Sequence, residues 1–236
     1  MALKKITDNL YQIPLGPVNA FLLIDGEQLI LIDTGFKNDH TKILKALKLL
    51  NRGPADIKHI ILTHSHPDHA GALADLVYIS GAKTYMHSED AALIRQGLAG
   101  RLPHEVSPEI LNKILYHLFI KRSANKNDVV QIDVELKDNE ILPLAGGIDI
   151  IYTPGHSLGH VSLYVKDLDL LIAGDICSNL MGLKFSTVYE NTAEGIRSIK
   201  KVANYSFNIA VFGHGNAILK NANVLLANKF KSYQEK

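Results

Sequence analysis

Residues 63–69 read Thr63-His64-Ser65-His66-Pro67-Asp68-His69, and this stretch decides how the rest of the chain is interpreted. It places four side chains of metal-ligand type within six residues, directly after the apolar run Ile60-Ile61-Leu62. The apolar run predicts a buried strand, and loops held by a rigid sheet commonly carry reactive groups. In extended backbone alternate side chains point the same way, so His64 and His66 are expected on one side. Imidazole and carboxylate ligands suit zinc, with iron or manganese as alternatives.

Three further stretches each place one ligand-type side chain beside a glycine at the end of an apolar run. They are Thr153-Pro154-Gly155-His156, Ala173-Gly174-Asp175 and Phe212-Gly213-His214. Glycine lets the backbone approach closely at such points, although any one of the three alone also fits an ordinary turn. Together with the histidine loop, they predict a site for two metal ions.

Apolar runs and turn signals outline the remaining elements. Strands are predicted at 21–24, 29–32, 60–62, 83–87, 129–136, 148–152, 161–165, 168–173 and 209–212, and helices at 41–50, 70–79, 88–96, 107–122, 192–204 and from about 221. This order predicts an α+β fold with sheets whose outer faces are covered by helices.

The chain carries no stretch that reads as an interdomain linker, so we expect a single domain over residues 1–236. A helical insert at about 97–123 separates two strand-rich stretches. In it, Ser107-Pro108-Glu109 has the residues of a helix start, and apolar side chains from Ile110 to Phe119 share one face.

Composition excludes several classes of protein. The 25 basic and 24 acidic residues leave a net charge of +1, whereas a nucleic-acid binder normally shows a basic patch. No apolar run reaches the roughly 18 residues that span a bilayer, and the first residues lack the apolar core of a signal peptide. The single cysteine, Cys177, has no internal disulfide partner. We therefore expect a cytoplasmic protein with a small-molecule substrate and neither a nucleic-acid nor a membrane partner.

These motifs resemble those of the metallo-β-lactamase fold superfamily. The matches run in order from Leu31-Ile32-Asp33-Thr34-Gly35 through residues 63–71, 153–160 and 173–175 to Phe212-Gly213-His214-Gly215. They extend from about residue 10 to residue 216, which is most of the chain. The resemblance implies an αββα sandwich with the metals at one edge of its two sheets.

The resemblance also implies a role for each ligand position. His64, His66 and His156 hold one metal ion, Asp68, His69 and His214 hold the second, and Asp175 bridges both. Asp33 matches a position behind the ligands, where a carboxylate orients imidazoles through their other nitrogen. A turn-forming aspartate is the plainer alternative.

Two neighbouring residues receive no ligand role. We expect His160 to support its loop, and Cys177 to be a small buried residue.

Two metal ions that share one water lower its pKa toward neutrality, so the expected reaction is hydrolysis by a metal-bridging hydroxide. Asp68 is expected to pass a proton to the leaving group. The bridging Asp175 disfavours the true β-lactamases of the superfamily, and Asp68 disfavours the flavodiiron branch. The family's nucleases, which cleave phosphodiesters, carry inserted domains and more basic surfaces.

Two branches of the superfamily remain for the bond that is cleaved. Only 22 residues follow His214, so we expect no helical C-terminal domain of the glyoxalase II type. Compact lactonases carry a helical segment where the insert lies, although Ser178 stands where acyl-homoserine lactonases have tyrosine. We therefore expect a small ester-type bond, a lactone or a thioester.

The insert is a candidate wall of the substrate pocket. Its apolar face is expected to cover an acyl chain, with Tyr116 and Phe119 near the mouth; the alternative is that this face packs on the sandwich. A mononuclear iron dioxygenase of the same fold and a phosphodiester hydrolase are the alternative activities. A non-catalytic module would lack ligands, and none is missing.

Overall fold

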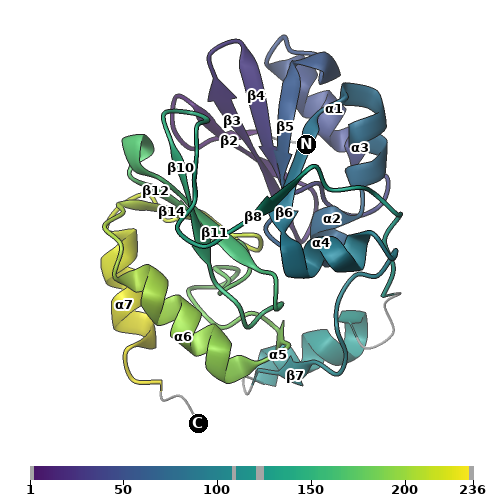
Figure 1. The fold of residues 1–236 in the computed structure, drawn as a ribbon. Coiled ribbons are helices and arrows are strands. Elements are labelled where there is room, and N and C mark those ends of the chain that lie inside the picture. Colours follow the sequence, from purple (N-terminus) through teal and green to yellow (C-terminus); the bar gives the residue numbers. More distant parts are fainter. Residues whose placement is uncertain (1–2, 108–109, 121–124, 234–236) are drawn as a thin grey trace.

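The computed structural model shows two β-sheets packed face to face, with helices on both outer faces (Figure 1). The structure describes residues 3–107, 110–120 and 125–233, and for residues 110, 111, 115, 119 and 120 it describes the backbone alone. The predicted αββα sandwich is confirmed. None of the helices in these described ranges is long and apolar enough to cross a bilayer.

The larger sheet has seven strands, and its first four form an antiparallel meander. Its order is β1 (Lys4–Lys5), β2 (Leu10–Pro14), β3 (Asn19–Asp25), β4 (Gln28–Ile32), β5 (Ile57–Ile61), β6 (Lys83–His87) and β8 (Val134–Leu136). From β4 onward the strands are parallel, so each connection must cross over the sheet. Helices α1 (His40–Leu49), α3 (Leu73–Ser80) and α4 (Ser88–Ile94) occupy those connections.

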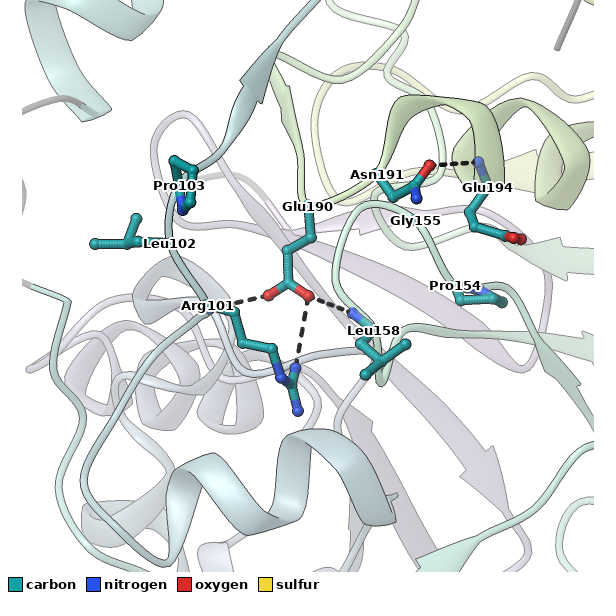
Figure 2. Close-up of a pocket in the computed structure, with 9 residues that line it drawn as sticks. All are labelled: Arg101, Leu102, Pro103, Pro154, Gly155, Leu158, Glu190, Asn191 and Glu194. Carbon is teal, nitrogen blue, oxygen red and sulfur yellow. Dashed lines mark hydrogen bonds and ion pairs between the residues drawn. The ribbon is translucent and has the colours of Figure 1, made fainter. Parts of the chain in front are cut away.

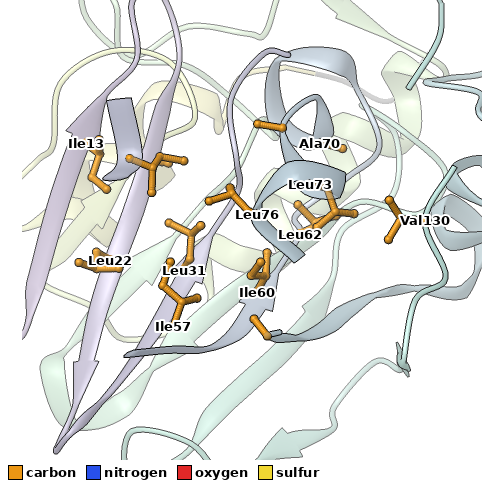
Figure 3. Packing of buried hydrophobic residues seen from close by; sticks show 14 of the residues in the cluster. Ile13, Leu22, Leu31, Ile57, Ile60, Leu62, Ala70, Leu73, Leu76 and Val130 are labelled. Carbon is orange, nitrogen blue, oxygen red and sulfur yellow. The ribbon is translucent and has the colours of Figure 1, made fainter. Parts of the chain in front are cut away.

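Both faces of these strands are buried, and their side chains alternate between two cores. Leu29 and Leu31 pack under the helices, whereas Ile30 and Ile32 face the second sheet. Figure 3 shows the helix side of this arrangement, where Leu73 and Leu76 of α3 lie over the strand residues. Burial on both faces gives the continuous apolar runs that made these strands recognisable from the sequence.

The second sheet has five strands and is covered by two helices. Its order is β14 (Ile209–Val211), β12 (Leu170–Ile172), β11 (Val161–Val165), β10 (Ile148–Tyr152) and β9 (Ile141–Leu142). Helices α6 (Thr192–Ala203) and α7 (Ala222–Phe230) pack on its outer face (Figure 1). The Asn191 side chain caps α6 by accepting a hydrogen bond from Glu194 N at 3.0 Å.

The loops that follow β4, β5, β10, β12 and β14 meet at one edge of the sandwich. Backbone hydrogen bonds join the two sheets there, from Val161 N to the Thr63 carbonyl at 2.9 Å and from Asn19 N to the Gly213 carbonyl at 2.8 Å. This edge therefore collects every predicted ligand.

Two predicted elements are shorter than expected. The helix predicted at 70–79 is two helices, α2 (Pro67–Ala70) and α3, which are separated at Gly71. The loop after β4 passes close to this point, because a Cβ on Gly71 would lie 2.6 Å from Lys37 N. In the predicted strand 129–136, only β8 is a strand. Asp133 leaves the strand pattern to accept hydrogen bonds from Thr84 N and Thr84 Oγ1, both at 2.8 Å.

The insert is only partly helical. It contains β7 (Glu105–Val106), which pairs with β13 (Val188–Tyr189), then α5 (Ile110–Leu115) and a π-helical turn (Tyr116–Ile120). Short 3₁₀ turns lie elsewhere, at Pro54–Asp56 and Lys166–Leu168. The predicted helix start at Pro108-Glu109 and the predicted end at Lys121-Arg122 lie outside the described residues.

The predicted apolar face of the insert is not buried where its side chains are described. Ile114 is 49% exposed and Leu118 is 68% exposed. Of the three side chains of α5 that the structure describes, the buried one is Asn112, whose Nδ2 donates to the Phe185 carbonyl at 3.2 Å. At Ile114 and Leu118, therefore, the alternative that this face packs on the sandwich is wrong.

Candidate metal centre

Three imidazoles from two loops converge at the sheet edge. His156 Nε2 lies 3.2 Å from His64 Nε2 and 3.0 Å from His66 Nδ1. All three side chains are buried. They form the first group of candidate ligands, as the sequence predicts.

A second group lies beside the first and contains a carboxylate. Asp68 Oδ2 is 3.3 Å from His214 Nε2 and 3.8 Å from His69 Nε2. Asp68 and His69 lie on the short helix α2, and His214 follows β14. Residues that are far apart in the chain thus complete this group.

Asp175 lies between the two groups. Its Oδ1 is 3.6 Å from His69 Nε2, while its Oδ2 is 3.1 Å from His214 Nε2 and 3.6 Å from His156 Nε2. One carboxylate therefore faces imidazoles of both groups.

In His156 and His214, the ring nitrogen that faces away from the centre shows which nitrogen can bind a metal ion. The Nδ1 atoms of His156 and His214 donate to the carbonyls of Val188 and Pro17, each at 2.8 Å. Because Nδ1 keeps its proton for the carbonyl, Nε2 is the atom of each neutral ring that can bind a metal ion.

Two buried atoms at the centre have no hydrogen-bond partner among the described residues: His69 Nε2 and Asp175 Oδ1. Buried polar atoms are normally satisfied, so their orphaned state points to a missing partner. Lone pairs that converge at about 3 Å also need a positive charge between them. A donor set of five imidazoles and two carboxylates therefore fits divalent metal ions.

Asp33 lies behind both groups. It is buried in the left-handed conformation (φ 60°), and its Oδ2 accepts a hydrogen bond from His69 Nδ1 at 2.8 Å. Its carboxylate also accepts from Thr63 N at 2.8 Å and from Thr63 Oγ1 at 2.9 Å. The Thr63 oxygen is then free to accept from His64 Nδ1 at 3.0 Å. Asp33 therefore reaches one ligand ring directly and another through Thr63.

His160 supports the Asp175 loop and does not point a free nitrogen at the centre. Its Nε2 accepts from Asp175 N at 2.9 Å, and its Nδ1 donates to Thr153 Oγ1 at 2.8 Å. Gly174 permits this contact, because a Cβ there would lie 2.5 Å from His160 Nε2. Burial lowers the pKa of His160 to about 4, so the ring is neutral at physiological pH. Cys177 is buried, as predicted, and burial raises the pKa of its thiol.

In the metal-free protein the imidazoles of the two groups differ in charge. Burial and neighbouring imidazoles hold the pKa values of His64 and His156 well below the ordinary value. In the second group burial also disfavours the charged forms, but Asp175 and neighbouring carboxylates outweigh it. They raise the pKa of His214 to about 10 and that of His69 well above its usual range. Protons therefore occupy the second group when no metal does.

A cavity of about 360 Å³ lies on the outer side of the His156 loop (Figure 2). It is lined by Arg101, Leu102 and Pro103 of the insert and by residues that include Pro154, Leu158 and Glu190. None of the candidate ligands lines it. Tyr116 does not line it either; this half-buried residue contacts the ring of His117, with centroids 5.5 Å apart. The side chain of Phe119 lies outside the described part of the chain.

Three buried polar groups escaped the sequence analysis. Asp90 is fully buried, although in the sequence it resembles an ordinary acid in the first turn of a helix. His104 Nε2 and Lys184 Nζ are buried without a hydrogen-bond partner in the described ranges. Nothing in the local sequence separates these residues from surface ones.

The sequence profile of the Metallo-beta-lactamase superfamily matches residues 13–214, and the chain belongs to this superfamily. The probable metallo-hydrolase YqgX of Bacillus subtilis is 32% identical over 173 residues, which cover 70% of this chain and 69% of that protein. An atrochrysone carboxyl ACP thioesterase of Pseudocercospora fijiensis is 24% identical over 217 residues, or 92% of this chain and 53% of its own length.

Solved structures agree on the fold. The metallo-beta-lactamase family protein TTHA1429 of Thermus thermophilus superposes with a TM-score of 0.72 at 23% identity, covering 96% of this chain and 80% of the other. Among curated relatives, the chain spans 52% of the lactamase-like protein aptB of Emericella nidulans and 84% of YobT of Bacillus subtilis. Family and ligand cluster together identify a metal-dependent hydrolase.

Proposed function

We propose that the protein is a binuclear hydrolase that holds two divalent ions of the zinc type and cleaves a lactone or a thioester. The observation that carries the proposal is the position of Asp175, whose two oxygens face different groups of imidazoles. A mononuclear site would leave the second group, Asp68, His69 and His214, without a purpose.

The chain's own residues divide the work of such a site. The first group and the second group would each hold one ion, with Asp175 as a ligand shared by both. When bound, the ions would supply a water of lowered pKa and a positive charge that polarises the substrate carbonyl. Asp33 and Thr63 keep the rings of His69 and His64 in the ligating tautomer. Asp68 turns Oδ2 toward His214, which leaves Oδ1 to exchange a proton with the leaving group.

An apolar acyl group fits the loops around the centre. Exposed apolar side chains follow the site residues closely in the chain: Phe36 comes after Asp33, Leu158 after His156, and Met181, which is 76% exposed, after Asp175. With Ile114 and Leu118 of the insert, they supply apolar surface that an acyl chain can cover. The fungal relative is named a thioesterase, which supports the thioester arm of the proposal.

The test combines elemental analysis with a hydrolysis screen on the same purified sample. The screen pairs acyl-homoserine and simple lactones with acyl thioesters, and a phosphodiester serves as the competing class. We expect two metal ions per chain and turnover of an ester-type substrate. One iron per chain with oxygen uptake would replace the proposal by a dioxygenase, and turnover of the phosphodiester alone would move it to that class.

Variants separate the roles. His66→Ala and Asp175→Ala should lose metal and activity, whereas the exposed His117→Ala serves as the matched histidine control. Asp68→Asn should lower kcat more than it lowers metal content. Full turnover by Asp68→Asn with both metals bound would contradict the proton-transfer role.

A further inference from the structure

Asp90 of α4 is fully buried, and each of its oxygens accepts two hydrogen bonds. Oδ2 accepts from Ser65 N at 2.9 Å and from Ser157 Oγ at 2.7 Å. Oδ1 accepts from Gly159 N at 3.0 Å and from the Arg101 guanidinium at 3.1 Å. The carboxylate therefore has no unsatisfied side.

These hydrogen bonds join the two loops that supply the first group of ligands. Ser65 lies between His64 and His66, whereas Ser157 and Gly159 follow His156. The fit is tight on the second loop, because a Cβ at Gly159 would lie 2.5 Å from both the backbone nitrogen and Oδ1 of Asp90. Asp90 therefore joins the two loops in addition to the backbone bond from Val161 N to the Thr63 carbonyl.

Arg101 offsets the buried charge of Asp90 and adds a second connection. Its guanidinium also lies 3.2 Å from Glu89 Oε2 and 3.6 Å from Glu190 Oε2. Glu190 in turn accepts from Arg101 N at 3.0 Å and from Leu158 N at 2.8 Å (Figure 2). Arg101 belongs to the insert, so the insert is tied to the His156 loop.

We propose that Asp90, held by Arg101, is the positioning residue that sets the spacing between the two loops, so that the three imidazoles of the first group converge on one cation. The inference rests on the proposed metal site, and it assigns that site a support outside the ligands. In the described part of the chain Asp90 bonds backbone and serine donors, and it acts through them and not through contact with a ligand ring.

The variant Asp90→Asn tests this geometry with little change in volume. An amide has one oxygen, so its NH₂ group must face either Ser65 N–H or Gly159 N–H, which are both donors. With the NH₂ group toward Ser65 N–H, the His64 loop loses its hydrogen bond to this side chain. With the NH₂ group toward Gly159 N–H, Gly159 and Arg101 lose theirs, and the His156 loop keeps only the bond from Ser157 Oγ. The matched control is Asp39→Asn, because Asp39 is also buried, accepts from a backbone nitrogen (Phe36 N, 3.0 Å) and pairs with a cation (Lys42, 2.7 Å). These bonds reach neither of the two loops that Asp90 joins.

The readout is Zn²⁺ affinity and stoichiometry, measured by competition with a chromogenic chelator. Ligand supports of this kind change metal affinity by about 10- to 100-fold. We expect a loss in this range for Asp90→Asn and none for Asp39→Asn. Arg101→Met should lower the Zn²⁺ affinity of the first group, and Arg101→Lys should restore part of that affinity. This pair of variants tests the inference even if Asp90→Asn does not fold.

Two backgrounds locate the effect. In the His214→Ala protein, whose second group is disabled, Asp90→Asn should still lower the Zn²⁺ affinity of the first group by about 10- to 100-fold. In the His156→Ala protein, whose first group is disabled, Asp90→Asn should change the Zn²⁺ affinity of the second group by less than about twofold. Equal losses in both backgrounds would show general loosening of the fold and overturn the inference.

Failure of the inference and failure of the proposed function are distinguishable. Wild-type protein that binds no metal would overturn both. Wild-type protein with two ions, together with unchanged affinity in Asp90→Asn and Arg101→Met, would overturn only the role of Asp90.

Discussion

Replacing Asp33 by asparagine should weaken metal binding although Asp33 touches no metal. Asparagine tolerates the left-handed backbone at this position (φ 60°), so the change is confined to one oxygen. If the amide oxygen faces His69 Nδ1, the NH₂ group faces the donor Thr63 N–H. If the amide turns over, His69 must accept at Nδ1 and carry its proton on Nε2, where the metal ligand should be.

Each orientation has a cost that can be estimated. A donor that faces a donor in a buried site costs about 1–3 kcal/mol. Loss of a carboxylate behind a ligand histidine typically weakens metal affinity by about 10- to 100-fold, which corresponds to about 1.4–2.7 kcal/mol. The larger loss should fall on the second group, because Asp33 bonds His69 directly and His64 only through Thr63.

The assay is a Zn²⁺ competition titration of the wild type, Asp33→Asn and Asp133→Asn. Asp133 is a close geometric match, since it accepts from both the backbone nitrogen and the hydroxyl of Thr84 at 2.8 Å. Only Asp33 also holds an imidazole, so only Asp33→Asn should bind Zn²⁺ more weakly. Unchanged affinity in Asp33→Asn, or an equal loss in Asp133→Asn, would refute the reasoning.

Three further predictions follow from the contacts and pKa values. Gly213→Ala should expel metal, because its Cβ would lie 2.1 Å from Asp175 Oδ1; elemental analysis against Gly53→Ala, which has open space, checks this. The pKa of His214 in the metal-free protein is raised to about 10 and that of His69 well above its usual range, so metal must displace protons from this group and apparent affinity should rise at least about tenfold per pH unit between pH 7 and 9; a flat profile would contradict this. The pKa of His160 is lowered to about 4 in the folded protein, so the neutral ring stabilises the fold above pH 6.5. This stabilisation is lost as pH falls toward 4. Urea unfolding of the metal-free protein should show that the free energy of unfolding falls by about 3 kcal/mol over this pH range, and by less in His160→Gln. The same pH dependence of unfolding in both proteins would disprove this.

The sequence by itself determined the ligand types, their order and the strands that precede them. The bounds predicted for β6, β10 and β11 agree with the structure, because strands buried on both faces read as apolar runs between turn signals. The ligands follow such runs directly, so their place at a strand end was a local property of the chain.

Only the tertiary structure decided how these residues work together. His156 lies 92 positions from His64, yet their nitrogens are 3.2 Å apart, and Asp90 bonds Ser65 and Gly159 from 25 and 69 positions away. The short β8 likewise depends on a distant partner, Thr84, which donates two hydrogen bonds to Asp133. A periodic pattern reports which face of a segment is buried. It does not report which distant donor meets a carboxylate there, and for that reason the support of the metal centre became visible only in the folded chain.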